Sequence, residues 1–72
     1  MDKELNNCYN EIFTKVLELQ GEYSDLMIAG NMAAQALRIY RTVLNDEDYN
    51  NMMKTIIRTT DEIKPYNREV SH

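Results

Sequence analysis

The sequence contains one cysteine, one proline, two glycines and one histidine among its 72 residues. A single cysteine excludes a disulfide within the chain and is typical of a reducing compartment. Cys8 and His72 are also too few ligands for a zinc site, which needs several thiolates or imidazoles. No histidine lies within the predicted helices to act as the base that Ser24 or Cys8 would need as a nucleophile. We therefore expect no catalytic residue, no metal and no cofactor, in a protein that is not an enzyme.

Long hydrophobic runs and an excess of positive charge are also missing. The most apolar stretch, residues 26–44, is interrupted by Asn31, Gln35, Arg38 and Arg41, so we expect no transmembrane helix. The first residues hold no basic segment followed by an apolar run, which predicts no secretory signal and a cytoplasmic location. The net charge of −4 repels phosphate backbones unless the basic residues gather on one face.

The sequence does contain a helical repeat of apolar residues along most of its length. This repeat and the scarcity of helix breakers predict an all-α fold. We expect three helices, at about residues 2–20, 25–44 and 46–64, packed as a small helical bundle or a helical hairpin. They form a single domain over residues 1–64, and residues 65–72 are predicted to be a disordered tail. A chain this short builds only a small core, which favours assembly with other chains.

Particular residues mark where the predicted helices begin and end. Gly21 lies where a helix commonly ends in a left-handed residue. Ser24 is the predicted N-cap of the second helix, and Asn45 or Asp46 is the predicted N-cap of the third. Pro65 disfavours helical backbone at the residue before it, so the third helix should end there.

The second predicted helix is apolar around more of its circumference than the other two. At 100° per residue its apolar residues cover an arc of about 200° and form two faces, one around Leu26 and Leu37 and one around Ile28 and Met32. Two interpretations stay open. In a lone three-helix domain, the two faces meet the first and third helices. In an oligomer, one face meets the same helix of another copy.

Small residues in this helix favour the oligomer. Glycine inside a helix costs about 1 kcal/mol relative to alanine, so Gly30 indicates that another backbone lies close to it. Alanines four residues apart let two backbones approach and gain dispersion contacts along a ridge. We therefore predict a homo-oligomer, a dimer or a tetramer, that self-associates through Ala29, Gly30, Ala33, Ala36, Leu37 and Tyr40.

The acidic run at residues 46–50 resembles the start of a calcium-binding loop, with oxygen ligands at alternate positions. The pattern fails further on, because Asn51 stands where the loop needs glycine and Ile57 where it needs glutamate. Capping of the third helix explains the same acidic residues. We therefore expect no calcium site.

The second and third helices, with a tight turn between them, share the outline of a helix-turn-helix. Acidic residues 46–48 would occupy the N-terminus of the recognition helix, where they would face phosphates. We therefore expect a protein partner and keep a nucleic-acid-associated regulator as the alternative hypothesis. The bases that this alternative would use are Arg38, Arg41, Lys54 and Arg58.

Polar side chains on the outer faces of the second and third helices form a candidate partner surface. Because arginine makes bidentate contacts with carboxylates, an acidic protein surface would fit it. The residues of this predicted surface are Asn31, Gln35, Arg38, Lys54 and Arg58.

The segment MAAQALRIYRTVLNDEDYNNMM resembles small helical proteins encoded by tailed bacteriophages, including marine and cyanobacterial ones. The resemblance covers roughly residues 28–57, and its features are the alanine-rich run into ALRIY, a short acidic turn and the aromatic Tyr49. It implies a viral protein in the host cytoplasm that binds a host protein. The family has no assigned catalytic motif, so the resemblance transfers no functional residue.

Overall fold

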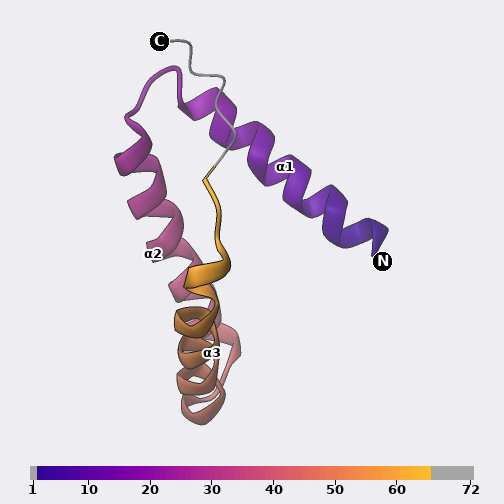
Figure 1. The fold of residues 1–72 in the computed structure, drawn as a ribbon, viewed down its shortest axis with the longest axis vertical. Coiled ribbons are helices and arrows are strands. Elements are labelled where there is room, and N and C mark those ends of the chain that lie inside the picture. The colour runs from indigo at the N-terminus through magenta and orange to yellow at the C-terminus, as the bar shows by residue number, and fades with distance from the viewer. Residues whose placement is uncertain (1, 66–72) are drawn as a thin grey trace. The chain divides into compact units, whose positions relative to one another are not determined.

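The computed structural model describes residues 2–65 and consists of helices joined by short connections (Figure 1). In chain order the helices are α1 (Lys3–Leu19), α2 (Asp25–Val43), α3 (Asp46–Thr59) and the 3₁₀ helix η1 (Thr60–Glu62). No strand occurs in residues 2–65, so the predicted all-α fold with three α-helices is confirmed. None of the helices described is both long and apolar enough to cross a membrane.

The chain divides into two compact units, Met1–Ile39 and Tyr40–His72, with the boundary inside α2. The first unit contains α1 and most of α2, and the second contains the end of α2, α3 and η1. The predicted single domain, residues 1–64, covers parts of both units. The predicted disordered tail, residues 65–72, lies outside the described residues except for Pro65, which has no regular secondary structure.

Side-chain caps explain where α2 and α3 begin. The Ser24 hydroxyl accepts a hydrogen bond from the Met27 backbone N–H at 3.1 Å. The Asn45 side-chain oxygen accepts one from the Asp48 backbone N–H at 2.7 Å. Each bond satisfies a donor that the first helical turn would leave without a partner. The N-cap predicted at Ser24 is confirmed, and of the two candidates for α3 the structure uses Asn45.

The end of α1 differs from the prediction at Gly21. The prediction of a left-handed residue there is wrong, because no glycine in the described chain has a positive φ. The chain continues instead in right-handed turns, with the Gly21 N–H donating to the Glu18 carbonyl at 3.3 Å and the Glu22 N–H to the Leu19 carbonyl at 2.9 Å. These tighter bonds satisfy the last carbonyls of the helix without a left-handed residue.

α3 ends earlier than the predicted residue 64. The Thr59 hydroxyl donates to the Ile56 carbonyl at 2.9 Å, and the Thr60 hydroxyl donates to the Ile57 carbonyl at 2.8 Å. Threonine hydroxyls that bond to nearby carbonyls compete with the helical ladder, and the chain tightens into η1 at this point. Ile63 then adopts extended backbone (φ −77°, ψ 129°) and is 74% exposed, so it does not continue the apolar stripe of α3.

The packed part of the first unit is small. Val16 of α1 and Ile28 of α2 are the two buried apolar side chains of residues 2–65. Phe13 and Leu19 are half-buried, and the Tyr9 and Phe13 rings stack with centroids 6.3 Å apart. Most of the apolar stripe of α1 therefore remains exposed to solvent.

The second unit has a half-buried cluster and no fully buried side chain among its described residues. The Arg41 guanidinium lies 3.6 Å from the centroid of the Tyr49 ring, and its Nη1 lies 3.4 Å from Oδ1 of Asp46. These contacts hold the last turn of α2 to the first turns of α3. The half-buried residues of the cluster are Tyr40, Leu44, Tyr49, Met52 and Met53.

Candidate interaction surfaces

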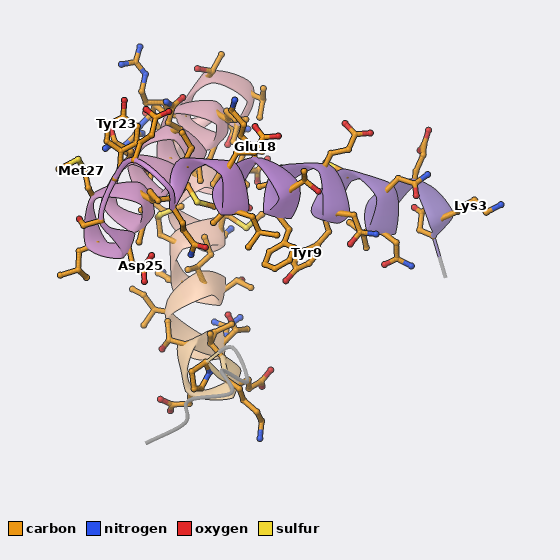
Figure 2. All side chains as sticks on the ribbon, turned by 90° about the horizontal axis from the view of Figure 1, so that it is seen from above. Lys3, Tyr9, Glu18, Tyr23, Asp25 and Met27 are labelled. Atoms are coloured by element: carbon orange, nitrogen blue, oxygen red, sulfur yellow. The ribbon has the colours of Figure 1, made fainter. Side chains whose placement is uncertain are left out.

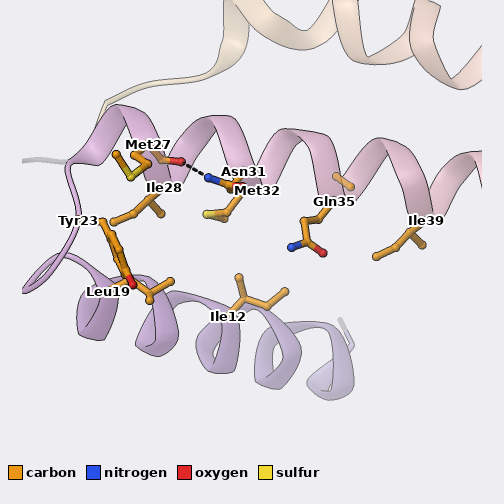
Figure 3. Close-up of a pocket in the computed structure, with 10 residues that line it drawn as sticks. Ile12, Leu19, Tyr23, Met27, Ile28, Asn31, Met32, Gln35 and Ile39 are labelled. Carbon is orange, nitrogen blue, oxygen red and sulfur yellow. Dashed lines mark hydrogen bonds between the residues drawn. The ribbon is translucent and has the colours of Figure 1, made fainter.

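An apolar groove of about 550 Å³ lies between α1 and α2 in the first unit (Figure 3). The two helices lie closest to each other at their connection and diverge away from it (Figure 1). This divergence leaves the groove open and its walls accessible. The residues that line it are Ile12, Leu19, Tyr23, Met27, Ile28, Asn31, Met32, Gln35, Ala36 and Ile39.

The groove arises because the apolar stripe of α1 and one apolar face of α2 point toward each other but do not pack together along their length. Ile12 is 51% exposed and Ile39 is 63% exposed, although both line the groove (Figure 3). Tyr23 and Met27 lie at the end of the groove where the chain turns from α1 into α2 (Figure 2). Tyr23 lies between the first and second predicted helices, so the sequence assigned it only to a connection. Its contribution to the wall of the groove depends on how the two helices diverge.

Two amides from the predicted partner surface lie in this groove. The Asn31 Nδ2 donates to the Met27 carbonyl at 2.9 Å, and the Gln35 side chain extends toward α1 (Figure 3). Asn31 and Gln35 therefore share a wall with apolar side chains and do not form a separate polar face. They add hydrogen-bonding groups to a groove that is otherwise lined by apolar side chains.

The other members of the predicted partner surface lie elsewhere. Arg38 is exposed on α2, and Lys54 and Arg58 are exposed on α3 in the second unit. The Arg58 Nη2 donates to the Thr55 hydroxyl oxygen at 3.3 Å on its own helix. The structure thus brings two of the five residues together in one groove, and the common surface of all five stays a prediction.

The face of α2 that carries Leu26, Gly30 and Leu37, two of them predicted self-association residues, is open. Leu26 is 86% exposed and Leu37 is 39% exposed. A Cβ built on Gly30 would have no heavy atom within 4 Å among the described residues outside its own helix backbone. The described chain therefore supplies no close helix crossing at Gly30, and such a crossing stays a prediction for a second copy.

The remaining predicted self-association residues are not all on this open face. Ala29 and Ala33 are exposed on α2, whereas Tyr40 is half-buried. Ala36 lines the groove toward α1. The predicted set is therefore divided between the two sides of α2.

The basic residues of the nucleic-acid alternative are partly engaged within the second unit. Arg41 pairs with Asp46 and covers the Tyr49 ring, as described above. The first turn of α3 is acidic throughout, with Asp46, Glu47 and Asp48. A phosphate backbone approaching this turn would meet negative charge.

The described residues hold no cluster built for metal binding. Among residues 2–65 no group of three or more His, Cys, Asp or Glu side chains could hold a metal ion. Cys8 is exposed and free on α1. The acidic residues 46–48 lie in the first turn of α3, where they complement the helix dipole.

No protein-family model, no curated protein and no solved structure matches the chain. The resemblance to bacteriophage proteins therefore stays a prediction.

Proposed function

We propose that this protein is a non-enzymatic helical module that works by protein–protein association and associates with itself through α2. The observation that carries the proposal is the exposure of large apolar side chains on α2 and along the groove. Leu26 is 86% exposed, Ile39 is 63% exposed and Met27 is 54% exposed. Large apolar side chains exposed on both faces of a helix are typical of protein-interaction sites.

The energetics of a single chain support this proposal. Fixing the backbone of one residue costs about 1–2 kcal/mol, and this cost is offset mainly by burial of apolar side chains. Val16 and Ile28 are the buried apolar side chains of the described residues. A second chain that covers the open faces of α2 would supply the burial that one chain lacks.

The groove gives the module a second place for a partner. Its apolar walls with a few amides suit an amphipathic helix, which inserts apolar side chains at helical spacing into such grooves. Methionines at positions 27 and 32 are flexible enough to adapt to different side chains. A host protein in the cytoplasm is the partner that fits the phage resemblance.

Thermal unfolding over a hundredfold range of protein concentration tests self-association. The midpoint should rise with concentration, because association stabilises the folded chain by mass action. The double variant Arg38→Glu/Arg58→Glu serves as the control, since both residues lie outside the open face of α2 and should leave the concentration dependence unchanged. A midpoint that is independent of concentration would overturn the proposal.

The same proteins test the nucleic-acid alternative. We expect no change in the mobility of duplex DNA at low salt with the unmodified protein. A salt-sensitive shift that disappears in the Arg38→Glu/Arg58→Glu variant would favour a nucleic-acid regulator over a protein-interaction module.

A further inference from the structure

The negative charge of the described chain is concentrated in the unit that contains the groove. Residues 2–39 include six acidic and three basic residues, whereas residues 40–65 include five acidic and four basic ones. The groove between α1 and α2 lies entirely within the first of these ranges. A partner of the groove must therefore match negative charge as well as apolar walls.

Acidic residues recur along one edge of the apolar stripe of α1. Glu4, Glu11 and Glu18 are seven residues apart, and each directly precedes an apolar residue. Because successive residues of a helix differ by 100°, the three carboxylates form a row beside the stripe that enters the groove at Ile12 and Leu19. This row of Glu4, Glu11 and Glu18 is called the acidic edge below.

The acidic edge is accessible to a partner. All three of its residues are exposed, and Glu11 has no ion-pair partner within residues 2–65. Glu18 Oε1 lies 3.4 Å from Nζ of Lys15, and the two side chains are 63% and 68% exposed. An exposed pair of this kind contributes little stability, so the Glu18 carboxylate can exchange Lys15 for a cation on a partner.

The groove has the length of about three turns of a helix. Its wall from α2 extends from Met27 to Ile39, which corresponds to about 18 Å along the axis. Ile12 from α1 and Gln35 from α2 point into the space between the two helices (Figure 3). None of the residues that line the groove is charged, so the charges that a bound segment meets come from residues beside it.

We propose that the groove binds an amphipathic helix of another protein that carries lysine or arginine beside its apolar face. The apolar side chains of this helix fill the groove, and its basic side chains pair with the Glu11 and Glu18 carboxylates. Arg38 is next to Ile39 on α2, so the basic side chains of the partner face α1. The inference rests on the proposed function as a protein-interaction module and names the chemical class of partner for the groove.

Binding of two designed peptides to the full chain tests the proposal. The basic peptide is an amphipathic helix of about five turns, with leucine at i, i+3, i+4 and i+7 and lysine at the flanking positions. The acidic peptide has glutamate in place of each lysine. Fluorescence anisotropy of the labelled peptides at low salt should give a Kd at least tenfold lower for the basic peptide, and added salt should weaken its binding. Equal affinity for the two peptides would overturn the proposal.

Variants of the carboxylates test the acidic edge. Glu11→Gln/Glu18→Gln should raise the Kd of the basic peptide about two- to thirtyfold, the range for two exposed ion pairs. Glu47→Gln/Glu62→Gln is the matched control, because it removes the same charge from exposed residues of the second unit. An equal loss of affinity in both double variants would show that total charge attracts the peptide, which contradicts the proposal.

Variants of exposed apolar residues test the groove. Ile39→Gln should raise the Kd of the basic peptide about tenfold, because it removes an apolar contact from one wall. Ile57→Gln is the matched control, since Ile57 is similarly exposed and lies on α3. Equal affinity of the Ile39→Gln and Ile57→Gln proteins would place the peptide outside the groove. Circular dichroism shows whether each variant is helical, and Ile12→Gln repeats the test if Ile39→Gln unfolds.

Light scattering on the same proteins separates failure of this proposal from failure of the proposed function. A self-associating protein that binds neither peptide overturns the basic partner alone, and a lower mass of its Ile39→Gln variant would identify a second copy as the occupant of the groove. A monomer that binds the basic peptide supports the basic partner and overturns self-association. A monomer that binds neither peptide overturns both.

Discussion

Replacing Leu26 by glutamine should weaken self-association without unfolding the single chain. Leu26 is 86% exposed at the second residue of α2, so its side chain contributes almost no burial within one chain. Glutamine has a helix propensity close to that of leucine, which keeps α2 intact. In the proposed self-association through the open face of α2, the substitution removes an apolar contact with the second copy.

The size of this effect follows from the surface that association covers. Full burial of a leucine side chain is worth about 1.5–3 kcal/mol. A two-fold dimer contains the Leu26 contact twice, but each copy lies at an end of the pair, where we take about half of full burial. The dimer should therefore lose about 1.5–3 kcal/mol, which corresponds to a dissociation constant about ten- to a hundredfold higher.

Sedimentation equilibrium of both proteins measures the two dissociation constants directly. Ile57→Gln is the matched control, because Ile57 is an apolar residue of α3 that is 69% exposed and lies outside the open face of α2. Its dissociation constant should equal that of the unmodified protein. The reasoning is refuted if Leu26→Gln associates as tightly as the unmodified protein, or if Ile57→Gln weakens association equally.

Three further results are expected. Gly30→Leu should stabilise the dissociated chain by up to about 1 kcal/mol, because the site is open and leucine favours the helix, yet weaken self-association because the larger side chain keeps a second copy from approaching Gly30; unfolding at low concentration and sedimentation measure the two effects, and tighter association would contradict the proposed close approach at Gly30. Asn45→Ala removes the cap on the Asp48 N–H and should lower the free energy of unfolding by about 1 kcal/mol in urea titrations, whereas an unchanged value would show that the cap is dispensable. Calcium and chelator should both leave the melting temperature unchanged, and a calcium-dependent rise would show that residues 46–50 bind the ion.

Features set by neighbouring residues could be predicted from the sequence. Ser24 and Asn45 are short polar residues directly before apolar repeats, and each caps its helix through one local hydrogen bond. The end of α3 was predicted too late, because the competition from the Thr59 and Thr60 hydroxyls depends on their side-chain conformation. Gly21 permits a left-handed backbone but does not require one, and the chain uses tighter right-handed turns.

The sequence predicted the candidate site only to the extent that a helical wheel determines which face of a helix each residue lies on. The wheel separates the face around Leu26 from the face around Ile28, and the structure places Ile28 against α1 while Leu26 remains exposed. The groove could not be predicted, because its volume depends on the angle at which α1 and α2 diverge. For the same reason the wheel assigned Asn31 and Gln35 to an outward polar face, although both line the groove.

Light scattering coupled to size-exclusion chromatography tests the central claim, self-association through α2, most directly. The unmodified protein, applied over a range of micromolar concentrations, should have at least twice the chain mass of 8.5 kDa. Under the same conditions the Leu26→Gln protein should shift toward 8.5 kDa, and the Ile57→Gln protein should not. A mass of 8.5 kDa for the unmodified protein at every concentration would contradict the claim.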